Sequence, residues 1–298
     1  MNELTSGAEL HDWTRAQRAG GRRIGLVPTM GYLHEGHLTL VDEARRRADA
    51  IVLSIFVNPL QFGPGEDLAR YPRDLPHDRA LAAARGVDAL FVPDVDTMYP
   101  AGSEIRVVPG PTAERWEGAA RPGHFTGVLT VVAKLFHLVE PELACFGRKD
   151  IQQLTLIRRM VRDLDWPIEI VEVPTVREPD GLALSSRNAY LRPEERRSAL
   201  AISRALAAAH RAFCEGETRA AALEQRMQQE LRGTPEIRVE YIAIVEPHGL
   251  VPVATVDGRT VIAVAARVGA TRLIDNISLA QGLGSKNSIT RPQLRAES

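Results

Sequence analysis

Short runs of β-branched residues alternate with segments of helical periodicity through the first 175 residues, and no other feature restricts the fold as strongly. Strands and helices in alternation form βαβ units, which place helices on the faces of a parallel sheet. We predict strands at 23–27, 50–57, 89–92, 104–108, 143–146 and 168–173. Helices are predicted at 36–47, 75–85, 126–138 and 150–164.

The pattern changes after Pro174. Helices are predicted at 193–213 and 217–232, and two or three strands follow between 237 and 277, an order typical of an α+β unit. We therefore predict an α/β domain over residues 1–175, a smaller α+β domain over 176–281, and a polar tail over 282–298 that frays.

The composition favours a small ligand and a reducing compartment. Hydrophobic residues make up 44% of the 298-residue chain and charged residues 25%, as in globular proteins with a substantial core. A formal net charge of −1 gives no overall field that would attract nucleic acid or an anionic membrane surface. Cys145 and Cys214 are too few for a disulfide framework or a zinc site. Because neither a signal-peptide pattern nor a run of 18 apolar residues occurs, we expect a cytoplasmic protein.

Two histidines mark the turn that follows the first predicted strand. His34 and His37 are three residues apart, so both can face the same group where the next helix begins. Helix N-termini at the carboxyl ends of parallel strands direct free N–H groups at anions, and phosphate is the expected guest. One histidine could instead cap the helix while the other packs. The second histidine and the intervening Gly36 favour the phosphate site.

Lysine is rare in this chain, which directs attention to Lys149. Only Lys134, Lys149 and Lys286 occur among 37 basic residues. Lys149 lies between a strand and a helix within residues 146–153, where a compact ammonium is suited to a second phosphate contact. Lys134 falls within a helical pattern and Lys286 within the polar tail, so neither is favoured as a site residue.

Three further segments carry polar groups at predicted turns. Asn58 and Gln61 follow the second strand and are suited to orient a polar substrate, although Asn58 could equally form the turn. For residues 121–127 we favour simple capping of the next helix. In the loop 174–188, two hydroxyls beside an arginine form a candidate phosphate clamp at Ser185, Ser186 and Arg187.

Five segments, in order, resemble the pantothenate synthetase (pantoate–β-alanine ligase) family. They are 28–37, 56–62, 121–125, 149–153 and 184–188, and the resemblance extends from about residue 22 to 280. It implies a Rossmann-like parallel sheet of the nucleotidyltransferase superfamily with a smaller α+β carboxy-terminal domain that closes over the site. It also implies ATP-dependent condensation of (R)-pantoate with β-alanine to pantothenate, releasing AMP and pyrophosphate through a pantoyl adenylate, by a magnesium-dependent, cytoplasmic homodimer.

The resemblance also implies roles for individual residues. Catalytic roles fall on His37, His34 and Lys149, and pantoate and β-alanine contacts on Gln61, Gln153 and Asn58. No dedicated metal site is implied, although Asp78 is a weak candidate for an outer contact. The implied ATP contacts are Met30, Gly31, Tyr32, Leu33, His34, Glu35, Gly36, His37, Gly147, Arg148, Lys149, Asp150, Val176, Leu184, Ser185, Ser186 and Arg187.

Two residues depart from the family pattern. Arg148 stands where a non-basic residue is common, so we expect an additional positive charge near the phosphates. Tyr32 stands where a smaller residue is usual, which bears on packing at the turn.

Two rival functions must be distinguished from the ligase activity that the resemblance implies. A nucleotide sensor without turnover would not need the second substrate site that the two glutamines indicate. Another adenylyl transferase of the same superfamily is a nearer rival, but a tRNA-charging enzyme would need a basic RNA-binding appendage, which the near-neutral charge does not indicate.

Overall fold

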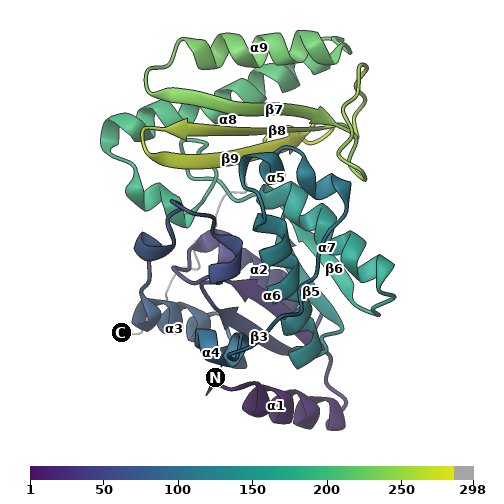
Figure 1. The fold of residues 1–298 in the computed structure, drawn as a ribbon. Helices are drawn as coiled ribbons and strands as arrows, with labels where there is room; N and C mark the ends of the chain where they lie inside the picture. Colours follow the sequence, from purple (N-terminus) through teal and green to yellow (C-terminus); the bar gives the residue numbers. More distant parts are fainter. Residues whose placement is uncertain (285–298) are drawn as a thin grey trace, which may run out of the picture.

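A six-stranded parallel sheet forms the larger half of the molecule in the computed structural model, which describes residues 1–284 (Figure 1). The strand order is β1-β4-β3-β2-β5-β6. The strands are β1 (Asn2–Leu4), β2 (Ile24–Thr29), β3 (Ala50–Ile55), β4 (Ala89–Phe91), β5 (Leu143–Gly147) and β6 (Glu169–Val173). Because β3 and β5 lie on opposite sides of β2, the strand order reverses there, and such a reversal opens a crevice at the carboxyl ends of the strands.

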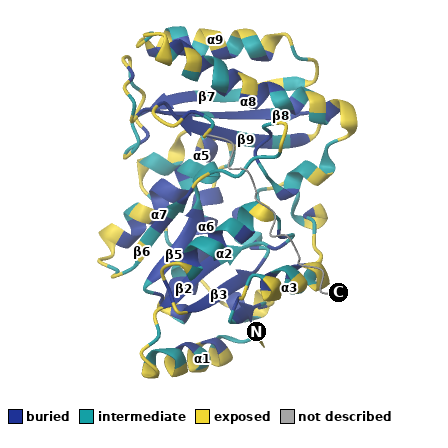
Figure 2. Ribbon diagram, turned by 180° about the vertical axis from the view of Figure 1, so that it is seen from behind, coloured by how far each residue is buried: buried dark blue, intermediate teal, exposed yellow. Residues whose placement is uncertain are grey.

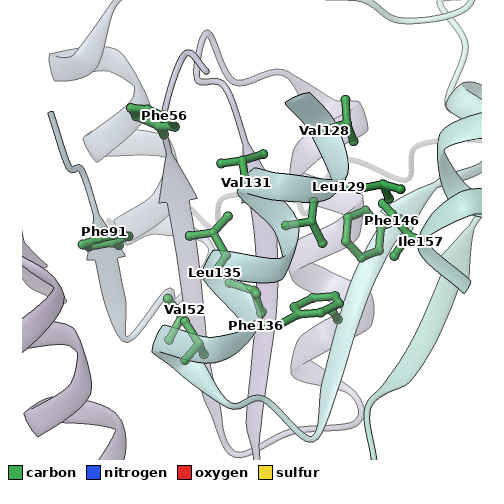
Figure 3. Packing of buried hydrophobic residues seen from close by; sticks show 14 of the residues in the cluster. Val52, Phe56, Phe91, Val128, Leu129, Val131, Leu135, Phe136, Phe146 and Ile157 are labelled. Carbon is green, nitrogen blue, oxygen red and sulfur yellow. The ribbon is translucent and has the colours of Figure 1, made fainter. Parts of the chain in front are cut away.

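Helices cover both faces of this sheet. They are α1 (Gly7–Ala19), α2 (Glu35–Arg45), α3 (Leu75–Ala84), α4 (Val95–Met98), α5 (Glu117–Ala120), α6 (His124–Val139) and α7 (Ile151–Asp163). Alternate residues of each strand point to opposite faces, so Leu26 packs with α6 and α7 while Val27 packs with α2. Figure 3 shows Leu135 and Phe136 of α6 within the first of these cores. Each fully buried side chain of this size contributes about 1.5–3 kcal/mol.

The smaller half consists of an antiparallel sheet with two helices packed on one face (Figure 1). Its elements are α8 (Pro193–Cys214), α9 (Ala220–Arg232), β7 (Ile237–Val245), β8 (Val261–Val268) and β9 (Thr271–Ser278). The strands are mostly buried, whereas the outer faces of the helices are exposed (Figure 2). No helix among residues 1–284 is long and apolar enough to cross a membrane.

Short 3-10 helices follow several strands and carry much of the site. They are η1 (Pro59–Gln61), η2 (Leu68–Arg70), η3 (Pro111–Glu114), η4 (Arg148–Asp150) and η5 (Ser186–Tyr190). Of these, η1 follows β3 and η4 follows β5, so both lie at the carboxyl edge of the sheet.

The predicted fold class is confirmed, with a parallel sheet followed by a small antiparallel one. One predicted strand is wrong: residues 104–108 are extended but pair with no strand of the described chain, and Ile105 and Val108 are 88% and 76% exposed. The strand β1 and helix α1 were not predicted. The domain boundary at residue 175 stays a prediction; the change from one sheet to the other falls between β6 and β7. Of the predicted tail 282–298, residues 285–298 lie outside the described residues.

Candidate active site

A cleft opens at the carboxyl edge of the parallel sheet, where the strand order reverses. The empty space in it, open solvent included, is ≈ 1390 Å³. Fifteen of the residues singled out from the sequence line it: Met30, His34, Gly36, His37, Asn58, Gln61, Gly147, Lys149, Asp150, Gln153, Val176, Leu184, Ser185, Ser186 and Arg187. The cleft therefore brings together segments that are up to 157 positions apart (187 − 30).

The two histidines form a close pair of tilted rings at the start of α2. His34 is the N-cap of this helix, and its Nδ1 accepts the N–H of Gly36 at 3.1 Å, while Nδ1 of His37 accepts the N–H of His34 at 3.4 Å. A Cβ on residue 36 would lie 2.9 Å from the His34 ring, so glycine makes room for this cap. Since both Nδ1 atoms accept, each neutral ring carries its proton on Nε2.

Burial keeps both rings neutral. It lowers the pKa of His34 to about 4, and the positive charge of Lys149 adds to the effect. Burial also lowers the pKa of His37 well below its ordinary value, with His34 and Lys149 contributing. The ring centroids lie 4.1 Å apart, and two positive charges at that distance would repel each other. The pair is therefore suited to donate hydrogen bonds from neutral rings.

Asp78 holds the turn that precedes this pair. Its Oδ2 accepts the N–H of Tyr32 at 2.8 Å and its Oδ1 accepts the N–H of Leu33 at 2.6 Å, and the carboxyl group is buried. Burial raises its pKa. The turn itself is strained, since Tyr32 has a φ of 52°, in the left-handed region that favours glycine. Both oxygens bind backbone and Asp78 does not line the cleft, so it acts as a structural anchor of the turn, and its weak outer metal contact stays a prediction.

Four of the implied ATP contacts shape this turn and do not line the cleft. Gly31 and Tyr32 form its left-handed corner, and Leu33 is buried in the core shared by α2 and the sheet. Glu35 faces away, with Oε2 2.7 Å from Nη2 of Arg85. Among residues 1–284 no group of three or more acidic, histidine or cysteine side chains is placed to hold a metal ion.

Gln61 lies buried at the floor of the cleft on η1. Its Nε2 donates to Sδ of Met30 at 3.1 Å, and its Oε1 accepts from Nδ2 of Asn58 at 3.1 Å. Oδ1 of Asn58 accepts from the Tyr99 hydroxyl at 2.9 Å and from the N–H of Leu60 at 3.3 Å. The amide of Asn58 is thus used by protein partners, so Asn58 both caps η1 and fixes Gln61 instead of offering a free group to a substrate.

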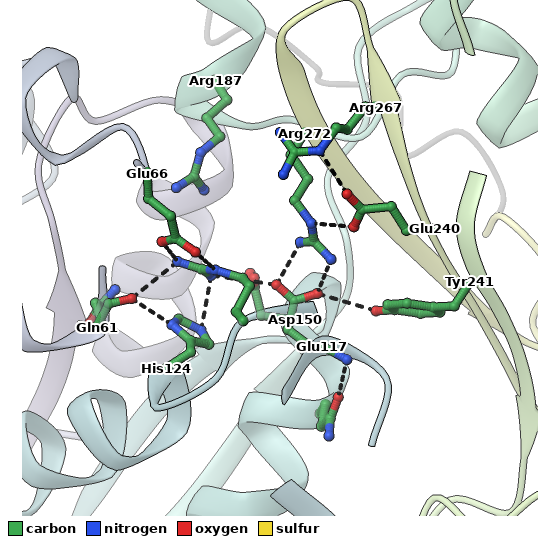
Figure 4. A network of polar contacts seen from close by, with 12 residues as sticks. Gln61, Glu66, Glu117, His124, Asp150, Arg187, Glu240, Tyr241, Arg267 and Arg272 are labelled. Atoms are coloured by element: carbon green, nitrogen blue, oxygen red, sulfur yellow. Dashed lines mark hydrogen bonds and ion pairs between the residues drawn. The ribbon is translucent and has the colours of Figure 1, made fainter. Parts of the chain in front are cut away.

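Arg121 and His124 also line the cleft, which the preferred interpretation of this segment as a simple helix cap missed. Figure 4 shows His124 beside Gln61, whose carbonyl also accepts from Arg121 at 3.1 Å, and Arg121 pairs with Glu66 at 2.6 Å. Burial lowers the pKa of His124 to about 4, and Arg121 adds to the effect. The sequence did carry a signal for their place in the cleft, because a cation and a histidine stand next to the start of a helix.

Lys149 and Gln153 face the cleft from η4 and α7. Nζ of Lys149 lies 3.7 Å from Oδ2 of Asp150. Within the described chain Gln153 makes no side-chain hydrogen bond, so its amide is available to a substrate. Arg148 turns the other way, toward Glu172 on β6 at 3.3 Å and toward Gln281. The expectation that Arg148 adds charge beside the phosphates is therefore wrong.

The candidate phosphate clamp is present but already engaged. Ser185 caps η5 by accepting the N–H of Arg187 at 3.3 Å, and Ser186 Oγ donates to the carbonyl of Tyr32 at 3.4 Å. The guanidinium of Arg187 makes a two-point contact with Asp67 at 2.8 and 2.9 Å. Carboxylates and phosphates are recognised by guanidinium in the same planar geometry, so a phosphate can replace Asp67 on Arg187.

A buried ion-pair cluster joins the two halves of the molecule beside the cleft (Figure 4). Glu117 of α5 accepts from Arg272 of β9 at 2.6 and 2.8 Å and from the Tyr241 hydroxyl at 3.3 Å. Burial alone would raise the pKa of Glu117, but Arg272 and Arg121 outweigh it and lower the pKa. Nothing local in the sequence indicates this pairing, since the partners are 155 residues apart.

Comparisons with known proteins point to one family. Residues 2–278 match the family described as pantoate-beta-alanine ligase. Pantothenate synthetase from Moorella thermoacetica is 54% identical over 279 residues, 94% of this chain and 99% of that one. A relative from Thermus thermophilus is 57% identical over 258 residues, 86% of this chain and 93% of its own.

Solved structures agree with these matches. A crystal structure of pantothenate synthetase from Thermus thermophilus superposes with a TM-score of 0.89 at 52% identity, covering 94% of this chain and 99% of that one. That of pantoate-beta-alanine ligase from Francisella tularensis, described as complexed with beta-gamma ATP and beta-alanine, superposes with a TM-score of 0.78 at 32% identity, covering 95% and 100%.

Proposed function

The chain belongs to the pantoate-beta-alanine ligase family, and we propose that it carries out its ATP-dependent condensation of pantoate with β-alanine in two steps, through a pantoyl adenylate. One observation supports the two-step route most directly. A single cleft combines neutral histidines at the start of α2, cations on η4 and η5, and amide groups on η1 and α7, so it can hold a nucleotide and a second polar acid together.

In the first step the pantoate carboxylate attacks the α-phosphorus of ATP while pyrophosphate leaves. Negative charge grows on the phosphoryl oxygens, so the main requirement is positioning and charge stabilisation. His37 and His34 donate from Nε2 to these oxygens, and Lys149 supplies a positive charge beside them. Arg187 exchanges Asp67 for a phosphate, with Ser185 and Ser186 beside it.

In the second step the amine of β-alanine attacks the acyl carbon of the adenylate, an amide bond forms, and AMP leaves with one proton released from the nitrogen. Gln61 and Gln153 hold the hydroxyl-bearing pantoyl group, and Gln61 also contacts β-alanine. The buried, fixed amide of Gln61 and the available amide of Gln153 support this assignment. No covalent bond to the protein is needed.

We propose that magnesium enters the site with ATP. The donor set supports this: each Asp78 oxygen already binds a backbone N–H, and the described residues provide no three-ligand cage. Mg²⁺ commonly binds through substrate phosphates and water with few protein ligands. Its chemistry when bound is to neutralise phosphate charge, and chelation by EDTA should abolish turnover reversibly.

A homodimer is proposed from the exposed extended segment at residues 103–110. Ile105 and Val108 are large apolar side chains that lie almost fully in solvent on a backbone without strand partners in the described chain. Exposed apolar side chains such as these are suited to pack against a second copy. Ile105→Lys should shift the molar mass measured by light scattering from dimer to monomer; a mass unchanged from wild type removes this segment from the interface.

We further propose that the enzyme works in the cytoplasm with small-molecule substrates and without nucleic acid. The net charge of −1 supports the absence of nucleic acid, and the unpaired Cys145 and Cys214 are compatible with a reducing compartment.

The experiment that tests the two-step route is a product assay with ATP, magnesium, pantoate and β-alanine, each omitted in turn. AMP and pyrophosphate together with amide, dependent on both acids, are expected. With β-alanine omitted and radiolabelled pyrophosphate added, label should pass into ATP only when pantoate is present. ADP in place of AMP would contradict the adenylate, and ATP binding without turnover would favour the sensor.

A further inference from the structure

Helix α6 approaches η1 unusually closely at Gly127. A Cβ built on this buried glycine would lie 2.2 Å from the carbonyl oxygen of Leu60 and 2.6 Å from the amide nitrogen of Gln61. Both atoms are backbone, so neither can turn aside as a flexible side chain would. Glycine weakens a helix relative to alanine, yet it stands in the first turn of α6 where the backbone of η1 needs the space.

Residues at and just before the start of α6 also hold the carbonyl of Gln61. The carbonyl of Gln61 accepts from Nδ1 of His124 at 2.9 Å and from Nη2 of Arg121 at 3.1 Å. Because a carbonyl only accepts, His124 carries its proton on Nδ1, and its Nε2 accepts from Nη1 of Arg121 at 3.1 Å. Asn58 completes the attachment by donating from Nδ2 both to the carbonyl of Gly127 at 3.0 Å and to Oε1 of Gln61.

The start of α6 and the preceding Arg121 therefore hold the carbonyl of Gln61, and Asn58 links its side chain to the carbonyl of Gly127. Contact with Gly127 sets how deep η1 lies against the helix, and the two hydrogen bonds from His124 and Arg121 set its rotation. None of these contacts needs a substrate. Any residue larger than glycine at position 127 requires η1 or α6 to shift, which displaces Gln61 relative to the helix.

We propose that Gly127 is a positioning residue, whose missing side chain sets the depth of Gln61 in the cleft, with His124 fixing the carbonyl of the same residue. This inference rests on the role proposed above for Gln61 in holding pantoate. It assigns to Gly127 a contribution to pantoate binding that is transmitted through η1, while His34, His37 and Arg187 keep their own contacts.

The test is Gly127→Ala, with Gly233→Ala as the matched control. Gly233 ends α9 far from the cleft, has a negative φ of −80° and has no atom within 4 Å of a built Cβ. We expect Gly127→Ala to lower kcat/KM for pantoate about 30- to 100-fold, the scale of a displacement near 1 Å. The Kd for ATP, measured by calorimetry, should stay within about twofold of wild type, since positioning of Gln61 is the only change. Gly233→Ala should leave both quantities unchanged.

A double-mutant cycle with Gln61→Ala separates positioning from general weakening of the protein. If Gly127 acts only through Gln61, then Gly127→Ala should change kcat/KM by less than about threefold once Gln61 is already alanine. An equal loss in both backgrounds overturns the proposal, as does wild-type pantoate kinetics in folded Gly127→Ala. If Gln61→Ala alone leaves pantoate kinetics unchanged, the proposed role of Gln61 fails instead.

A second pair of variants covers the case in which Gly127→Ala does not fold. His124→Phe keeps an aromatic ring but removes the donor to Gln61, whereas His124→Asn retains an N–H donor near the position of Nδ1. We expect KM for pantoate to rise about fivefold in His124→Phe, on the scale of one neutral hydrogen bond, and to recover in His124→Asn. Equal kinetics for the two variants overturns the proposal.

Discussion

Replacing Glu117 with glutamine removes the charge at the centre of the ion-pair cluster while keeping its shape. In the wild type this buried carboxylate makes the two-point contact with Arg272, accepts from Tyr241 and lies 3.4 Å from Arg121. Glutamine retains one acceptor oxygen, but it places an N–H against the guanidinium of Arg272. The variant therefore leaves a buried arginine facing a donor in place of a negative charge.

The loss can be estimated from these contacts. Breaking a buried ion pair by removing one partner costs about 3–5 kcal/mol. Arg272 keeps Glu240, whose oxygen lies 2.7 Å away, and Arg121 keeps Glu66, so the lower part of the range applies. We expect Glu117→Gln to lower the free energy of unfolding by about 3 kcal/mol. Urea unfolding followed by circular dichroism measures this value by linear extrapolation.

Glu43→Gln is the matched control. Glu43 also pairs with two arginines, Arg46 at 2.7 Å and Arg47 at 2.7 Å, but these lie on the surface of α2 and the turn that follows it. Exposed pairs contribute little, so we expect a clearly smaller loss. Equal losses in the two variants would refute the argument that burial between the two halves makes the Glu117 cluster important.

The pH dependence of the unfolding free energy provides an independent check of the charge on Glu117. The pKa of Glu117 is lowered below its ordinary 4.5 in the folded protein, so its contribution to stability is complete above pH 4.5 and is lost as the pH falls through the folded value. The difference between wild type and Glu117→Gln should therefore be constant near neutrality and shrink in acid. A difference that grows in acid contradicts the charge assignment.

Three further predictions concern the cleft. His37→Ala should lower turnover about 100-fold or more in a pyrophosphate-release assay, because one preorganised donor is lost; near-normal turnover removes His37 from its proposed role. Lys149→Arg should impair the same assay if the compact ammonium matters more than its charge, and unchanged kinetics would contradict this. His34→Asn keeps a residue that can cap the helix but removes the titrating ring. In the wild type the folded pKa of His34, about 4, lies below its ordinary 6.5, so the protein gains stability as the pH rises from about 4 to 6.5. The thermal midpoint of the variant should change less between pH 5 and 7.5 than that of wild type, and an equal change would be the contrary result.

The local sequence pattern was sufficient to predict most of the fold, and the elements that it failed to predict have physical explanations. The alternation at residues 104–108 is that of a strand, but pairing depends on a neighbour that local sequence does not specify. Helix α1 was readable: Ser6 and Glu9 form a capping box, with Glu9 N–H donating to Ser6 Oγ at 3.2 Å.

Residue type at strand ends predicted much of the cleft, whereas the direction of neighbouring side chains was not predictable. Lys149 and Arg148 are adjacent cations on one turn, yet only the lysine faces the cleft, because Glu172 on β6 draws the arginine away. In the same way, the role of Asp78 depends on backbone groups 45 and 46 positions earlier. Such long-range partners are set by topology and not by local pattern.

The histidine pair shows why a structural and a functional interpretation of one motif need not compete. By accepting backbone N–H groups, the two Nδ1 atoms cap α2, and the same bonds leave the Nε2 protons free for the cleft. Protonating either Nδ1 would break its cap and place a charge beside Lys149, which agrees with the lowered pKa of both rings. A reaction that develops negative charge on phosphoryl oxygens needs donors that do not have to gain or lose a proton. The cap that stabilises the helix is therefore also the device that fixes the protonation state of the candidate catalytic groups.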